Sequence, residues 1–140
     1  MADIRFETGL VDYDINGRAT VRFNPTDSVF IERMFRAFDA LDRKQEDYQA
    51  EIDRLSDNRE VFEIARARDA EMRAMVDEAL GAPVCDAVFG GMNVYAVADG
   101  LPVWCNLMLA IFDLIDTTFA AEQKKTNPRI AKYTAKYQRK

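Results

Sequence analysis

Histidine is absent from this chain of 140 residues, and cysteine is nearly absent. Without an imidazole, every catalytic triad or dyad that uses histidine as its base is excluded. Cys85 and Cys105 form no CxxC motif, and two thiols cannot complete a four-ligand zinc site without other ligand types. We therefore expect no metal and no cofactor. We expect both cysteines to be reduced core residues, with a disulfide between them as the alternative.

Long hydrophobic runs are also missing. The longest, residues 103–112, is interrupted by Asn106 and followed by Asp113, whereas a membrane-spanning helix needs roughly 20 apolar residues. The first residues, MADIRFETG, have no apolar stretch behind a basic start, so we expect no signal peptide. The 24 acidic residues could form carboxylate pairs, but none lies in a recognisable site. We therefore expect a protein that is not an enzyme.

Positive charge is missing from one stretch of the chain and concentrated at its end. No Lys or Arg occurs in residues 74–123, whereas residues 124–140 carry seven basic residues and no acidic one. Residues 1–123 contain 12 basic and 24 acidic residues, a net charge of −12, against +7 for the tail. Such segregation is typical of a tail that is held by an acidic partner, either in another molecule or on the protein's own surface.

The first 24 residues have the alternating pattern of β-strands. Ile4 and Phe6 alternate with charged residues, and further apolar residues alternate on both sides of Asn16-Gly17. A two-residue loop would mix apolar and polar faces, so we predict the three-residue loop Ile15-Asn16-Gly17, with Gly17 left-handed. The predicted pairs are Tyr13 with Ala19, Val11 with Val21, and Asp14 with Arg18.

Two apolar stripes at three- and four-residue spacing then predict an antiparallel helical hairpin over residues 26–80. Asn24 is the expected N-cap, with Thr26 as the alternative, and Pro25 and Asp27 suit the first turn. Residues 56–58 separate the two helices, and the second ends at residues 80–81. The stripes consist of Phe30, Met34, Phe38 (or Ala37), Leu41, Tyr48, Ile52 and Leu55, then Val61, Ala65, Met72, Met75 (or Val76) and Ala79.

The first of these helices should be about 45 Å long at ~1.5 Å per residue. A compact domain of this size has a diameter of roughly 37 Å, so the hairpin should project. Its tip, residues 42–60, has 11 charged residues out of 19. The tip is therefore either a solvated coiled coil or an arm that contacts a sister subunit or a client protein.

The rest of the body has a short apolar segment and one long apolar helix. Residues 84–89 predict a short helix, and Gly90-Gly91 is read as a tight connection because no phosphate-binding motif surrounds it. The last helix is predicted over residues 101–122, with Pro102 near its first turn. Its inner face should contain Trp104, Leu107, Met108, Ile111, Leu114, Ile115 and Thr118. This helix is either central to the core or partly covered by another chain.

The sequence thus predicts an α+β fold that is predominantly α. An N-terminal β-hairpin or meander (residues 3–24) precedes the helical hairpin, a short helix and the central apolar helix. Residues 1–123 should form one compact domain, and residues 124–140 a basic tail.

The tail can form a helix with Asn127 as its cap, in which lysines align at four-residue spacing beside tyrosines. It could be mobile and solvated, bind an acidic protein surface, or bind nucleic acid, although a body at −12 would repel phosphates. We also expect a homo-oligomer, with a dimer as the simplest case. The candidate partner-binding residues are Lys124, Lys125, Arg129, Lys132, Tyr133, Lys136, Tyr137, Arg139 and Lys140.

Three segments carry a family resemblance: INGRATVRFNPTDSVFIERM at residues 15–34, DAVFGGMNVY at 86–95 and KYTAKYQRK at 132–140. Together they resemble small phage and prophage proteins that are encoded among the tail genes of long-tailed phages and are taken as tail assembly chaperones. The resemblance implies a non-enzymatic protein in the cytoplasm of the bacterial host. It also implies a task, which is to coat the long tape-measure protein until tail-tube subunits polymerise around it. A virion structural subunit of the tail or the head–tail connector is the alternative, and a nucleic-acid-binding accessory protein is a more distant one.

Overall fold

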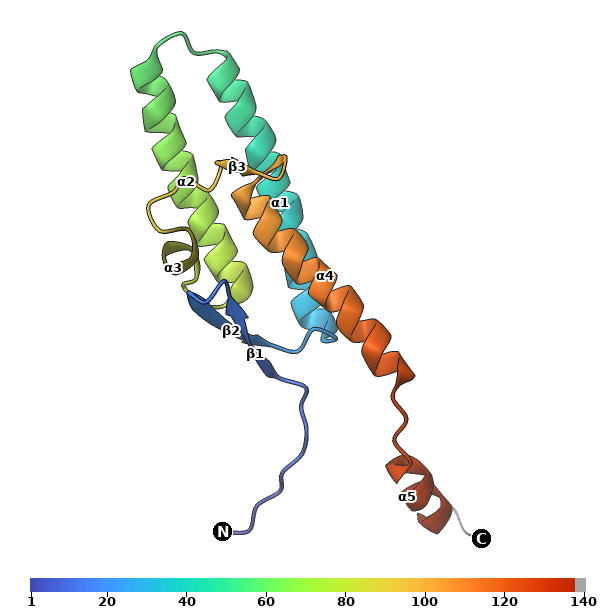
Figure 1. Cartoon of the computed structure of the whole chain (residues 1–140). Helices are drawn as coiled ribbons and strands as arrows, with labels where there is room; N and C mark the ends of the chain where they lie inside the picture. The colour runs from blue at the N-terminus through green and yellow to red at the C-terminus, as the bar shows by residue number, and fades with distance from the viewer. Residues whose placement is uncertain (138–140) are drawn as a thin grey trace.

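The computed structural model describes residues 1–137 and consists of a long helical hairpin with a smaller β-hairpin near its base (Figure 1). The chain is α+β and predominantly helical, as the sequence predicts. In chain order the elements are β1 (Val11–Ile15), β2 (Ala19–Phe23), α1 (Ser28–Asp53), α2 (Asn58–Leu80), α3 (Cys85–Phe89), β3 (Val97–Ala98), β4 (Leu101–Pro102), α4 (Val103–Lys124) and α5 (Arg129–Tyr137).

The N-terminal strands form a single antiparallel hairpin, β1–β2. No strand occurs in residues 1–10, so the prediction of strands from residue 3 was wrong. Ile4 and Phe6 alternate with charges but are exposed, and alternation alone makes no strand without a partner strand or a surface to cover. β2 has both: Phe23 is buried and stacks on Phe30 of α1, with ring centroids 4.2 Å apart.

The β1–β2 loop has the predicted length of three residues, but it lies one residue later, at residues 16–18. The predicted register was therefore wrong by two residues. Apolar pairing could not separate the two registers, because a shift of two keeps every side chain on the same face. The geometry of the turn determines the register instead. Asn16 and Gly17 both have positive φ, and Arg18 N donates to Ile15 O at 2.9 Å. The observed pairs are Val11 with Phe23, Asp12 with Arg22, Tyr13 with Val21, Asp14 with Thr20 and Ile15 with Ala19.

Helix α1 begins at Ser28, two residues later than predicted, and its N-cap is Asp27. The Asp27 carboxylate accepts a hydrogen bond from Val29 N at 3.0 Å. Asn24, the expected cap, closes the preceding turn instead. Its Oδ1 accepts from Thr26 N and Thr26 Oγ1, both at 2.8 Å, and its Nδ2 donates to Thr8 O at 2.9 Å. Asn24 therefore attaches residues 8–9 to the start of the helical hairpin.

The α1–α2 hairpin projects beyond the other elements, as its predicted length requires (Figure 1). The core lies in the half of the hairpin away from its tip, where Met34 and Leu41 of α1 and Met72 and Val76 of α2 are fully buried. Towards the tip the stripe residues are only partly buried. There the two helices are joined by charged side chains, of which Arg68 binds Glu51 at 2.8 Å. The buried apolar residues are Val21, Phe23, Phe30, Met34, Leu41, Met72, Val76, Ala79, Leu80, Val84, Cys85, Val94, Trp104, Cys105, Leu107, Met108, Ile111 and Ile115.

Polar side chains of α2 attach the segment that follows it. Asp77 Oδ1 accepts from Val84 N and Cys85 N at 3.0 and 2.9 Å, which satisfies the N-terminus of α3. Arg73, whose side chain is 13% exposed, binds Asp69 and donates to carbonyl oxygens of the loop after α3. Because these bonds link residues far apart in sequence, they position the loop that leads to α4.

Helix α4 begins at Val103 and ends at Lys124, two residues later at each end than predicted. Residues 101–102, expected in its first turn, instead belong to the small β3–β4 hairpin, in which Asp99 and Gly100 both have positive φ. The inner face is largely as predicted: Trp104, Leu107, Met108, Ile111 and Ile115 are buried. Of the helices in residues 1–137, α4 is long and apolar enough to cross a membrane, a test that the core helices of globular proteins also pass.

Gly81 should be sensitive to substitution. It ends α2 in the left-handed region, with φ 70°, while a Cβ there would meet no atom within 4 Å. Gly81→Ala should therefore lower the free energy of unfolding by about 1 kcal/mol through backbone strain alone. Gly91→Ala is the matched control, because Gly91 also has open space but no positive φ. Equal losses in urea unfolding of the two variants would contradict this explanation.

Candidate protein-interaction surfaces

The basic tail forms a separate C-terminal helix, α5, which lies beyond the end of α4 (Figure 1). Asn127 is positioned as predicted: its Oδ1 accepts from Arg129 N at 3.1 Å. Ile130 is 78% exposed and Tyr133 45% exposed. Contacts within the described part of the chain therefore leave the apolar side chains of α5 exposed to water.

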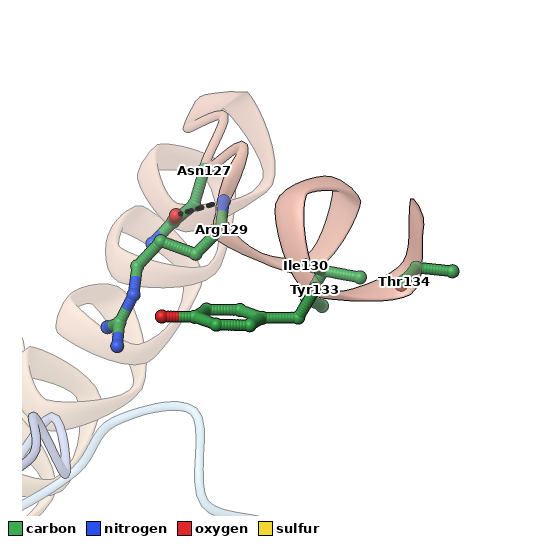
Figure 2. A pocket seen from close by; sticks show the side chains of 5 residues that line it. All are labelled: Asn127, Arg129, Ile130, Tyr133 and Thr134. Atoms are coloured by element: carbon green, nitrogen blue, oxygen red, sulfur yellow. Dashed lines mark hydrogen bonds between the residues drawn. The ribbon is translucent and has the colours of Figure 1, made fainter. Parts of the chain in front are cut away.

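The two kinds of side chain on α5 lie on adjacent faces that meet at Tyr133. Ile130 and Tyr133 are three residues apart and share one face, whereas Arg129, Lys132 and Lys136 follow the adjacent face at spacings of three and four. Figure 2 shows the Arg129 side chain and the Tyr133 ring extending in the same direction from the helix. Lys132 Nζ lies 5.4 Å from the centroid of the Tyr133 ring. The helix is therefore amphipathic, with cations beside an exposed aromatic ring.

The nine predicted partner-binding residues do not form one unit. Lys124 is the last residue of α4, and Lys125 pairs with Glu122 at 2.9 Å. Tyr137 ends α5, and Arg139 and Lys140 lie outside the described residues. Besides Tyr137, α5 carries four of the predicted residues: Arg129, Lys132, Tyr133 and Lys136.

The face of α5 near Asn127 and Tyr133 borders an open depression of 470 Å³ (Figure 2). Four of its five lining residues are exposed, so it is a surface feature instead of an enclosed pocket. Its lining residues contain no carboxylate and no thiol. A second depression of 550 Å³ lies between the β1–β2 loop and the start of α4 and is mostly apolar. Both are suited to shallow contacts with another protein more than to enclosing a small molecule.

A second exposed apolar region lies where α1 and α4 run side by side, and sequence reasoning missed its most exposed member. Phe35 of α1 is 59% exposed and lies against Phe112 of α4, with centroids 4.7 Å apart. Leu109 and Phe119 of α4 are each 37% exposed and fall three and seven residues from Phe112, on its side of the helix. The signal was present, because Phe35 is a large apolar residue outside the predicted stripe.

Carboxylates surround this apolar region. Asp116 follows Phe112 by four residues, Asp113 follows Leu109 by four, and Asp39 follows Phe35 by four, so each lies near one of these apolar side chains. Asp42, one turn further along α1, acts electrostatically on Cys105 and so lies near α4. None of the four forms an ion pair with another residue in 1–137. We call this region the α1/α4 surface; its residues are Phe35, Asp39, Asp42, Leu109, Phe112, Asp113, Asp116 and Phe119.

Both cysteines are buried and free, as expected from the sequence. Burial raises the pKa of the Cys85 thiol well above its ordinary range, and Asp77 raises it further. Burial, followed by Asp42, also raises the pKa of Cys105. Since the thiolate is the reactive form, both thiols should be inert in the folded protein.

The raised pKa values of the two thiols predict that the stability of the fold depends on pH. An unfolded thiol has a pKa of about 8.5, so the raised folded-state pKa values stabilise the fold fully below that pH. The stabilisation is lost progressively as the pH rises above it.

At pH 8.5, iodoacetamide should label neither cysteine in native protein and both in denaturant. Equal labelling rates in the two conditions would contradict the burial of the thiols.

Neither surface contains an arrangement typical of catalysis. In residues 1–137, no group of three or more Cys, Asp or Glu is placed to hold a metal ion. No protein-family model, curated protein or solved structure matches the chain. Its exposed surfaces, together with the resemblance that the sequence analysis gives as an expectation, are therefore the basis for a functional proposal.

Proposed function

We propose that this protein is a non-enzymatic phage tail assembly chaperone, or a related tail-morphogenesis factor, that binds the tape-measure protein in the cytoplasm of the bacterial host. The observation that carries the proposal is the presence of two exposed amphipathic helical surfaces, α5 and the α1/α4 surface. Exposed apolar side chains rimmed by charges are typical of protein-binding sites.

The geometry of these surfaces fits an extended client. A tape-measure protein is expected to be a long helix, and an amphipathic helix binds along a surface through apolar residues spaced by three or four positions. The α1/α4 surface offers Leu109, Phe112 and Phe119 on one side of α4, at spacings of three and seven residues, which are one and two helical turns. Contacts of this kind are shallow and can be released, as a chaperone that leaves during tube polymerisation requires.

Co-expression with the tape-measure protein tests the proposal. The wild-type protein should raise the soluble fraction of the tape-measure protein and co-purify with it. Phe35→Ser should weaken co-purification, because it removes an aromatic side chain from the α1/α4 surface. Phe62→Ser is a matched control, because Phe62 is 62% exposed but lies on α2.

Each result other than this pattern counts against the proposal. If the wild-type protein neither raises solubility nor co-purifies, the chaperone function is contradicted. If Phe62→Ser weakens binding and Phe35→Ser does not, the client binds the projecting hairpin and the α1/α4 surface is not the site.

A further inference from the structure

Helix α5 and the α1/α4 surface have opposite charge and matching apolar content. The described part of α5 carries three cations, Arg129, Lys132 and Lys136, beside Ile130 and Tyr133. The α1/α4 surface carries four carboxylates without an ion pair in residues 1–137, beside its four apolar residues. Because residues 74–123 contain no Lys or Arg, α4 has no basic side chain before Lys124 to neutralise Asp113 or Asp116.

The two surfaces also match in length. The nine residues of α5 span about 12 Å at 1.5 Å per residue, and the 15 residues from Cys105, near Asp42, to Phe119 span about 21 Å. The whole of α5 therefore fits within the α1/α4 surface. In the structure, however, α5 lies beyond the end of α4 and does not cover the surface of its own chain (Figure 1).

We propose that α5 of one copy of this protein docks on the α1/α4 surface of a second copy, and that the exchange is reciprocal in a two-fold dimer. Ile130 and Tyr133 would pack against Phe112 and its apolar neighbours, and the cations of α5 would pair with the carboxylates. A two-fold arrangement uses the same contact twice, which is the commonest way for identical chains to close an assembly.

This contact explains two features that the isolated chain leaves unexplained. It covers the apolar side chains of both surfaces, and it places the +7 tail of one copy against the −12 body of the other. The dimer contact would form in the protein without a client, so it does not depend on which client the protein binds. A client helix that used the α1/α4 surface would have to displace α5.

Charge reversal of each surface in turn tests the proposal. The tail variant is Arg129→Glu/Lys132→Glu/Lys136→Glu, and the body variant is Asp113→Lys/Asp116→Lys. All five side chains are exposed, so both variants should keep the helical circular dichroism of the wild type. Their melting temperatures should equal that of the wild type at concentrations where the wild type is monomeric. The association of each is measured by light scattering and sedimentation over a range of concentrations.

The wild-type protein should have a mass of about twice 16.0 kDa at high concentration. Each variant alone should dissociate at least about tenfold more readily, because both of its contacts then place like charges together. An equimolar mixture of the two variants should associate again. In the mixed dimer the wild-type tail meets the wild-type body, and the negative tail meets the positive body.

Other outcomes overturn the proposal. A wild-type protein that is monomeric at every concentration would show that no such dimer forms. Dimerisation of both variants as tightly as the wild type would place the interface elsewhere. Failure of the mixture to associate, with both variants folded, would show that the tail and the α1/α4 surface do not contact each other.

Discussion

Trp104→Ala should lower the free energy of unfolding by about 3–5 kcal/mol, the usual cost of truncating a large buried aromatic residue. Trp104 is 1% exposed and packs against Phe38 of α1, with ring centroids 5.8 Å apart. Its Nε1 donates to Gln45 Oε1 at 2.9 Å, so the substitution also removes a bond between α4 and α1. Because a small domain is stable by only about 5–15 kcal/mol, this variant should melt far below the wild type.

Two controls separate the causes of that loss. Leu109→Ala on the same helix should cost less than about 1 kcal/mol, because Leu109 is 37% exposed. Trp104→Phe retains an aromatic ring but removes the indole N–H, so it should cost an intermediate amount. If Trp104→Ala proved no more harmful than Leu109→Ala in urea unfolding, α4 would not be the central helix of the core.

Arg73→Ala should be the second most damaging substitution, at about 2–4 kcal/mol. The Arg73 guanidinium donates to Asp69 at 3.0 Å and to Asp86 at 2.9 Å, and also to the carbonyl oxygens of Gly90 and Met92 at 2.9 and 2.6 Å. Removing it leaves the largely buried Asp69 carboxylate without its cation. Asp86 is 94% exposed and contributes little, since water screens its charge.

The loss should depend on the guanidinium fork and not only on charge. Arg73→Lys keeps a cation near Asp69 but cannot reach both carbonyl oxygens in the same geometry, so it should remain clearly destabilised. Arg66→Ala on the exposed side of the same helix should change stability by no more than about 0.5 kcal/mol. Similar urea midpoints for Arg73→Ala and Arg66→Ala would mean that this network does not hold the loop after α3.

The elements that were predictable from the sequence are those with a long periodic pattern. The stripes of α1 and α2, the break at Asp57 and the end of α2 at Leu80-Gly81 are all where the pattern places them. The boundaries that failed depend on competition between neighbouring residues. Asn24 and Asp27 are both good caps, and only the bond from Asn24 to Thr8, sixteen residues earlier, shows why Asn24 is used elsewhere.

Hydrogen bonds and packing contacts between residues far apart in sequence account for the remaining differences between the prediction and the structure. In the sequence, Arg73 is one of many charged residues of its predicted helix. Nothing in its spacing shows that it binds a loop seventeen to nineteen residues later. The helix at 129–137 could be predicted because its cap and its periodicity are local. The α1/α4 surface could not, because Phe35 becomes part of it only when α4 lies beside α1.

The measurement that tests the proposed function most directly is quantitative mass spectrometry of infected cells and of purified phage particles. A tail assembly chaperone should occur in cell extracts in a complex with the tape-measure protein and should be absent from finished particles. A fixed, stoichiometric amount in the particles would contradict the chaperone function and identify a structural subunit of the virion instead.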